Sequence, residues 1–154
     1  MAAREVPNAI VGAGTVLKRE DLLAVSDAGA QFAISPGVTD GLYAAAATSA
    51  IPFIPAIATA SELMHGLDEG HARFKFFPAE SAGGVGALKS FAGPFAHVRF
   101  CPTGGIDAAK APAYLALSNV ITVGGSWMVP KDALASRDWA TIGRLAADCA
   151  RLRG

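Results

Sequence analysis

The chain has 154 residues, of which 52% are hydrophobic and 17% are charged, and its 13 basic and 13 acidic residues cancel. This composition excludes a disordered chain and predicts one domain, residues 1–154, with a core of its own. Zero net charge gives no reason to expect binding to nucleic acid or to an anionic membrane. The cysteines and histidines lack ligand spacing, so we expect neither a disulfide nor a metal. No apolar run approaches the ~20 residues of a membrane span, so we expect a cytoplasmic protein.

Strand and helix patterns alternate along the chain. Residues 9–16 form an apolar, glycine-containing run that predicts a strand, and residues 18–28 follow as an amphipathic helix. The pattern recurs five more times, with strands expected within 31–37, 52–58, 74–78, 98–102 and 120–125, and helices within 39–49, 61–66, 85–91, 108–117 and 139–152. Successive strands begin 21 to 24 residues apart, which fits one parallel strand plus one crossover helix.

Two parallel-sheet architectures fit this alternation, an open doubly wound sheet and a (β/α) barrel. Glycine pairs follow the last two strands, at Gly104-Gly105 and Gly124-Gly125, where barrels commonly bind phosphate through backbone N–H groups. An open dinucleotide-binding sheet would need a glycine fingerprint after its first strand, and residues 12–14 lack the third glycine. We therefore predict an α/β fold of the (β/α)8 TIM-barrel class with only six of the eight units present.

The candidate catalytic residue is Lys75, in the middle of the apolar strand at residues 74–78. Strand alternation places Lys75 and Phe77 on one face and Phe74 and Phe76 on the other. A lysine in a dry, aromatic site has a lowered pKa, and its neutral amine can form a Schiff base with a carbonyl substrate. The alternative is a structural lysine whose stem is packed and whose ammonium reaches water.

The other candidates lie where the remaining strands end, since barrel active sites form at the carboxyl ends of the strands. They comprise a hydroxyl group, an apolar wall and two anion-binding turns: Thr15, Pro36, Pro55, Phe77, Thr103, Gly104, Gly105, Gly124, Gly125 and Ser126. Glu80 is expected outside the pocket, because Pro78 ends the strand before it.

Several of these segments resemble those of a known family. They are GAGTVL at residues 12–17, FAISPG at 32–37, FKFFPAE at 74–80, RFCPTGGI at 99–106 and GGSW at 124–127. From about Glu5 to the C-terminus they resemble, in order and spacing, the class I 2-dehydro-3-deoxy-phosphogluconate (KDPG) aldolases.

The resemblance implies a homotrimeric (β/α)8 barrel that needs no metal or cofactor. It implies cleavage of 2-dehydro-3-deoxy-6-phospho-D-gluconate to pyruvate and D-glyceraldehyde 3-phosphate, and, as in many members, of 4-hydroxy-2-oxoglutarate (KHG) to pyruvate and glyoxylate. By this resemblance Lys75 forms the Schiff base, and Thr15, Pro36 and Phe77 line the pyruvate pocket. Thr103, Gly104 and Gly105 hold the pyruvyl end and begin the phosphate site, which Gly124, Gly125 and Ser126 complete.

The sequence departs from the family pattern at its start. Family members carry two further units before the segment at 12–17, and these supply a glutamate general acid/base and an arginine that binds the substrate carboxylate. Neither has a counterpart here, and Arg4, Glu5, Val6 and Pro7 resemble the end of the second helix, as expected of an N-terminally shortened chain. Loss of a general acid/base typically lowers a rate ~10²–10⁴-fold. Two alternatives therefore remain, a catalytically impaired or inactive fragment that at most binds pyruvate or a sugar phosphate, and a phosphogalactonate-type aldolase.

Overall fold

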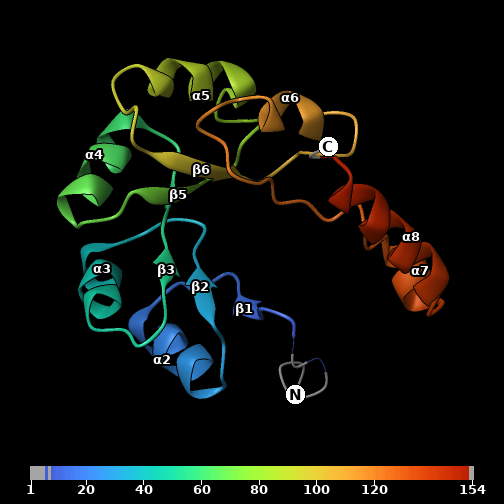
Figure 1. Ribbon diagram of the computed structural model, residues 1–154. Helices are drawn as coiled ribbons and strands as arrows, with labels where there is room; N and C mark the ends of the chain where they lie inside the picture. Colours follow the sequence, from blue (N-terminus) through green and yellow to red (C-terminus); the bar gives the residue numbers. More distant parts are fainter. Residues whose placement is uncertain (1–5, 7, 153–154) are drawn as a thin grey trace. The chain divides into compact units, whose positions relative to one another are not determined.

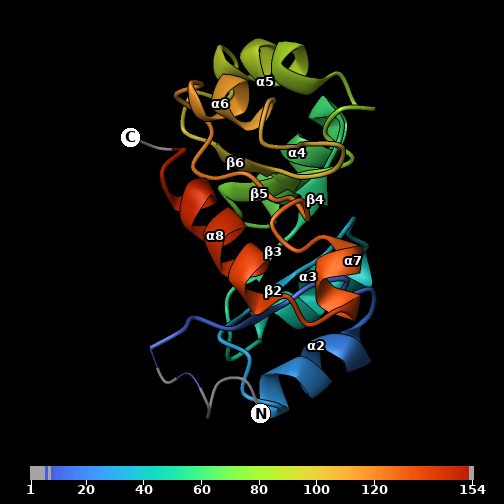
Figure 2. The same cartoon turned by 90° about the vertical axis from the view of Figure 1, so that its right-hand side faces the viewer.

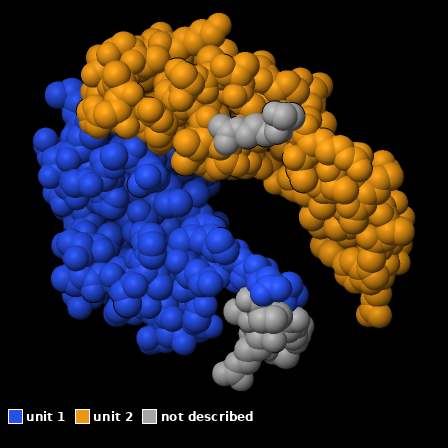
Figure 3. Space-filling model, in the orientation of Figure 1, with its two compact units in different colours: residues 1–77 blue, residues 78–154 orange. Residues whose placement is uncertain are grey.

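A computed structural model describes Val6 and residues 8–152 of the chain. It divides into two compact units, unit 1 (residues 1–77) and unit 2 (residues 78–154), which are coloured separately in Figure 3. The end of a helix that we predicted at residues 4–7 lies outside the described residues, except for Val6. Both units contain β-structure and helices (Figures 1 and 2), so the predicted α/β class is confirmed.

Unit 1 begins with a parallel sheet of three short strands in the order β1, β2, β3. The strands are β1 (Gly12–Ala13), β2 (Phe32–Ile34) and β3 (Phe53–Ile54). Helices α2 (Arg19–Asp27) and α3 (Asp40–Ala47) follow the first two strands and pack beside them (Figure 1). Their apolar side chains meet those of the sheet in one core cluster of Val16, Leu22, Ala33, Leu42 and Phe53.

Pro55 divides the strand that we predicted over residues 52–58. Before it, β3 pairs with β2, and after it, β4 (Ala56–Ile57) pairs in parallel with β5 (Arg73–Phe76). The reason is that proline has no N–H to donate, which interrupts a hydrogen-bonded ladder. The chain therefore leaves one strand pair at Pro55 and enters another directly after it.

Threonine side chains start two of the helices. The Thr39 hydroxyl accepts a hydrogen bond from the N–H of Leu42 at the start of α3, which lies within the helix predicted over residues 39–49. Helix α4 (Ala60–Asp68) starts before the predicted Ser61, because Thr59 and Glu62 form a reciprocal capping box. The Thr59 hydroxyl accepts from the Glu62 N–H, and the Glu62 carboxylate accepts from the Thr59 N–H.

Unit 2 contains one regular strand among the described residues, β6 (Arg99–Pro102), and four helices. The helices are α5 (Gly84–Ala92), α6 (Ala111–Leu115), α7 (Lys131–Ala135) and α8 (Trp139–Ala150). Helix α7 was not predicted, and it packs against α8 (Figure 2). No helix of the described residues is long and apolar enough to cross a membrane.

Residues 120–125 do not form the regular strand that we predicted. They pair in parallel with the β6 segment only at two isolated bridges, between Phe100 and Val120 and between Thr103 and Gly124. The ladder is interrupted at Pro102, which has no N–H to donate, although its carbonyl still accepts from Gly124 at 2.8 Å. The predicted count of six complete strand-helix units is therefore not confirmed.

Candidate active site

The side chains of β5 alternate as the sequence predicts. Phe74 and Phe76 are fully buried, whereas Lys75 and Phe77 are half-buried on the other face. The Lys75 ammonium lies 4.4 Å from the centre of the Phe77 ring, within the range of a cation–π interaction. The strand holds Lys75 in place, because its N–H donates to the Pro55 carbonyl at 2.9 Å. Lys75 is therefore an amine beside an aromatic wall on a regular strand.

Pro36 and Phe77 line the same small cavity of unit 1. The cavity has a volume of about 70 Å³, and Ala56, Ile57 and Glu62 also contribute to its wall. Glu62 is committed to helix capping there, and although burial opposes the shift, hydrogen bonds from Ala58 and Thr59 lower its pKa. The cavity thus offers an apolar wall with an anionic carboxylate at its edge.

Thr15 lies two residues after the end of β1, in an unusual backbone conformation. Its φ is +61°, a left-handed value that costs a non-glycine residue roughly 1–2 kcal/mol. The Thr15 side chain is exposed, so its burial does not offset this cost. The next residue, Val16, donates its N–H to the Ile34 carbonyl at 3.3 Å. Strain of this kind is concentrated at functional sites, which adds a structural reason to consider Thr15.

The two predicted glycine turns meet in unit 2. Thr103 and Gly124 form a parallel bridge, and a Cβ added to Gly124 would lie 3.0 Å from Thr103 Cγ2 and overlap its hydroxyl. Gly104 and Gly105 both have positive φ, +107° and +77°. A Cβ on Gly125 would overlap the Trp127 ring. Glycine is therefore required in both turns, by close approach in one and by backbone conformation in the other.

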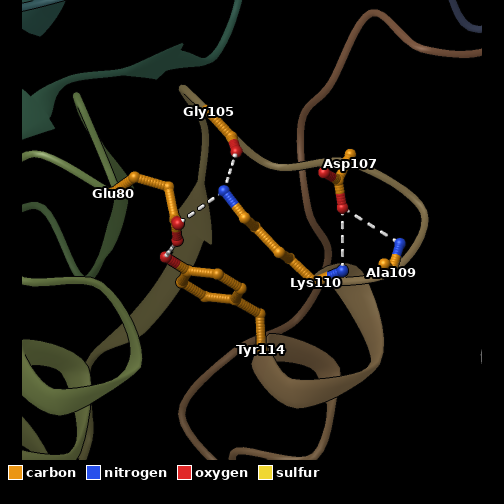
Figure 4. Close-up of polar contacts among 6 residues, drawn as sticks. All are labelled: Glu80, Gly105, Asp107, Ala109, Lys110 and Tyr114. Carbon is orange, nitrogen blue, oxygen red and sulfur yellow. Dashed lines mark hydrogen bonds and ion pairs between the residues drawn. The ribbon is translucent and has the colours of Figure 1, made fainter.

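A polar network beside the Gly104-Gly105 turn was missed by the sequence analysis. Glu80 accepts a hydrogen bond from the Tyr114 hydroxyl and pairs with the Lys110 ammonium at 2.8 Å (Figure 4). Lys110 also donates to the Gly105 carbonyl at 3.0 Å, and Asp107 accepts from the N–H groups of Ala109 and Lys110. The sequence shows Lys110 and Tyr114 four residues apart, a spacing at which two side chains lie on one face of a helix. Their partner Glu80 is 30 residues before Lys110 and 34 before Tyr114, so no local pattern connects it to them.

The network perturbs the acidity of its members. Hydrogen bonds from Lys110 and Tyr114 hold the pKa of Glu80 below its usual range, and the bond to Glu80 raises the pKa of Lys110. Burial and the hydrogen bond to Glu80 raise the pKa of Tyr114. At neutral pH the network therefore consists of a carboxylate, an ammonium and a neutral phenol.

The predicted site residues fall into two groups. Unit 1 carries Lys75, Phe77, Pro36, Thr15 and Pro55. Unit 2 carries the residues of the two turns, namely Thr103, Gly104, Gly105, Gly124, Gly125 and Ser126, and such turns suit an anion. Within the described residues, no group of three or more histidine, cysteine or carboxylate side chains could hold a metal ion.

Comparison with known proteins gives consistent matches along the chain. The model of the family "KDPG and KHG aldolase" matches residues 1–145. The KHG/KDPG aldolase of Escherichia coli K12 is 59% identical over 146 residues, which cover 95% of this chain and 68% of that protein.

Two solved structures share the fold closely. The KDPG aldolase of Legionella pneumophila, with pyruvate captured as a covalent carbinolamine intermediate, has a TM-score of 0.93 at 47% identity, covering 96% of this chain and 71% of that one. The 2-keto-3-deoxy-6-phosphogluconate aldolase of Zymomonas mobilis ZM4 with 3-phosphoglycerate has a TM-score of 0.89 at 46% identity, covering 97% and 70%. With matches of this extent in sequence and structure, the chain belongs to the KDPG and KHG aldolase family.

Proposed function

We propose that this chain acts on 2-keto-3-deoxy-6-phosphogluconate as a class I aldolase, with Lys75 as the amine that forms the Schiff base. The observation that carries the proposal is the position of Lys75 on β5, half-buried and 4.4 Å from the Phe77 ring. It is supported by the pyruvate carbinolamine in the Legionella pneumophila relative, because a carbinolamine forms when an amine adds to a ketone.

The chemistry would proceed through covalent intermediates. The Lys75 amine adds to the C2 ketone, the carbinolamine loses water, and the resulting iminium accepts the electron pair of the C3–C4 bond as that bond breaks. The C4 hydroxyl loses its proton and becomes the aldehyde carbonyl of glyceraldehyde 3-phosphate. The enamine then takes a proton at C3, and water releases pyruvate and the free lysine. We assign no general base among the described residues.

The two groups of site residues would bind different parts of the substrate. Thr15, Pro36 and Phe77 would line the pyruvate pocket. Thr103, Gly104 and Gly105 would hold the pyruvyl end and begin the phosphate site, which Gly124, Gly125 and Ser126 would complete. Contacts to a phosphate remote from the reacting bond supply binding energy for orientation. The 3-phosphoglycerate in the Zymomonas mobilis structure, a phosphorylated three-carbon acid, is consistent with this assignment.

Three further expectations belong to the same proposal. Cleavage of 4-hydroxy-2-oxoglutarate is supported by the family's description and by the E. coli relative's name. A single barrel-type domain over residues 1–154 is supported by the TM-scores to the two aldolases. The homotrimer and the cytoplasmic location stay predictions, and analytical ultracentrifugation would test the first of them.

The first experiment is to incubate the purified chain with pyruvate and borohydride and to measure its intact mass. We expect one reduced pyruvyl group per chain, absent from Lys75→Met and present in Lys89→Met, which removes an exposed lysine of α5. An adduct that persists in Lys75→Met would refute the assignment of Lys75.

Cleavage is measured separately, by coupling pyruvate release from 2-keto-3-deoxy-6-phosphogluconate to lactate dehydrogenase. Turnover that depends on Lys75 supports the full proposal. An adduct without turnover would support the alternative of a catalytically impaired pyruvate binder.

A further inference from the structure

We propose that Glu80, Lys110 and Tyr114 (the Glu80 network) are positioning residues that hold the Gly104-Gly105 turn in the conformation that binds the substrate phosphate. This inference deepens the proposed function and rests on it. None of the three side chains is assigned to substrate contact.

The network and the backbone beside it fix three successive carbonyl groups of the turn. The Thr103 carbonyl accepts from the Ala79 N–H at 2.8 Å, and the Gly104 carbonyl accepts from the Glu80 N–H at 3.2 Å. The Gly105 carbonyl accepts from the Lys110 ammonium at 3.0 Å. Both the main chain and the side chain of Glu80 therefore act on this turn, the first directly and the second through Lys110.

This arrangement leaves the N–H groups of the turn for a ligand. No acceptor among the described residues takes the N–H of Gly104 or Gly105. Gly104 and Gly105 have φ values of +107° and +77°, a backbone conformation that residues other than glycine rarely adopt. With the carbonyl groups held on one side by hydrogen bonds, the N–H groups can converge on an anion, as in other backbone anion sites.

The packing around Glu80 is close enough to transmit its position. A Cβ on Gly105 would lie 2.8 Å from Glu80 Cγ and 3.0 Å from Glu80 Cβ. On the other side, a Cβ on Gly84 would lie 3.1 Å from the Tyr114 hydroxyl. The Tyr114 ring is fully buried, so the hydroxyl that holds Glu80 sits on a fixed support. A shift of the carboxylate would therefore move the turn.

The alternative is that Lys110 is a direct phosphate ligand, and the two roles predict opposite effects of Glu80→Gln on the affinity for phosphate. As a positioning residue, Lys110 is held by Glu80, so Glu80→Gln loosens the turn and weakens phosphate binding. As a direct ligand, Lys110 would be released from its carboxylate partner by Glu80→Gln, and phosphate binding would become tighter. Glu80→Gln keeps the size and the hydrogen-bonding oxygen of the side chain, so the change is mainly one of charge.

The test is a titration of the ¹⁵N-labelled full chain with inorganic phosphate, followed by NMR at the Gly104 and Gly105 amides. We expect saturable shifts of both amides in the wild type and an affinity about tenfold lower in Glu80→Gln and Lys110→Met, the effect of losing a hydrogen bond to a charged group. Lys110→Arg should recover part of the loss. Matched controls with the same charge changes, Asp132→Asn and Lys89→Met, should bind as the wild type does.

Unchanged or tighter binding in Glu80→Gln overturns the proposal, and so does a wild type whose two amides do not respond to phosphate. If either variant fails to fold, Tyr114→Phe replaces it, because only the buried hydroxyl is lost, and affinity equal to wild type would then overturn the proposal. The pyruvate adduct at Lys75 is measured independently. An adduct without a phosphate response rejects this inference alone, whereas a phosphate response without an adduct rejects the Schiff-base assignment alone.

Discussion

Replacement of Gly105 by alanine tests the close approach of Glu80 to the turn. Gly29 is the matched control, because its φ of +86° resembles the +77° of Gly105 but nothing lies within 4 Å of an added Cβ. Gly29→Ala should cost only the left-handed conformation, about 1–2 kcal/mol. Gly105→Ala carries the same cost and also forces the Cβ against Glu80 Cγ, so overpacking should add about 1–3 kcal/mol.

The assay is urea unfolding followed by circular dichroism, with the free energy of unfolding compared among the variants. A double-mutant cycle with Glu80→Ala removes Cγ but keeps Glu80 Cβ, 3.0 Å from the added Cβ, so the two changes should couple by about 1 kcal/mol and Gly105→Ala should lose only part of its extra cost. Equal destabilisation by Gly29→Ala and Gly105→Ala in the wild-type background would refute the reasoning that Glu80 presses on the turn.

Three further predictions concern stability. Gly66→Ala should destabilise the fold by about 2 kcal/mol, because the added Cβ would overlap the Phe74 ring. Gly86→Ala, in an open part of α5, should stabilise the fold by up to about 1 kcal/mol. Urea midpoints of the two variants that move in the same direction would contradict this. Burial lowers the pKa of His71 in the folded chain, so on acidification the imidazole is protonated in the unfolded chain before it is protonated in the folded one. The free energy of unfolding should therefore fall as the pH drops below about 6.5. The same pH dependence in His71→Leu would count against this. Thr59→Ala removes the cap of α4 and should cost about 1 kcal/mol in the same unfolding assay, while an unchanged midpoint would mean that the cap contributes nothing.

Helix and strand positions followed from local patterns wherever the local signal was strong. The alternation around Lys75 predicted which side chains of β5 share a face, and the pattern over residues 39–49 predicted α3. The patterns failed at two prolines. Pro55 sits inside an apolar run that looks continuous and Pro102 ends one, and each interrupts a ladder because it has no N–H to donate.

The sequence by itself determined the family and the candidate residues, because short motifs such as the lysine strand and the glycine turns carry their chemistry within a few neighbouring positions. Only the tertiary structure showed that Glu80, expected to lie outside the pocket, contacts Lys110 and Tyr114 beside the Gly104-Gly105 turn. Such a network depends on where two segments 30 residues apart meet. Hydrophobic periodicity reports which face of each segment is buried, but it does not report which polar groups meet across the contact.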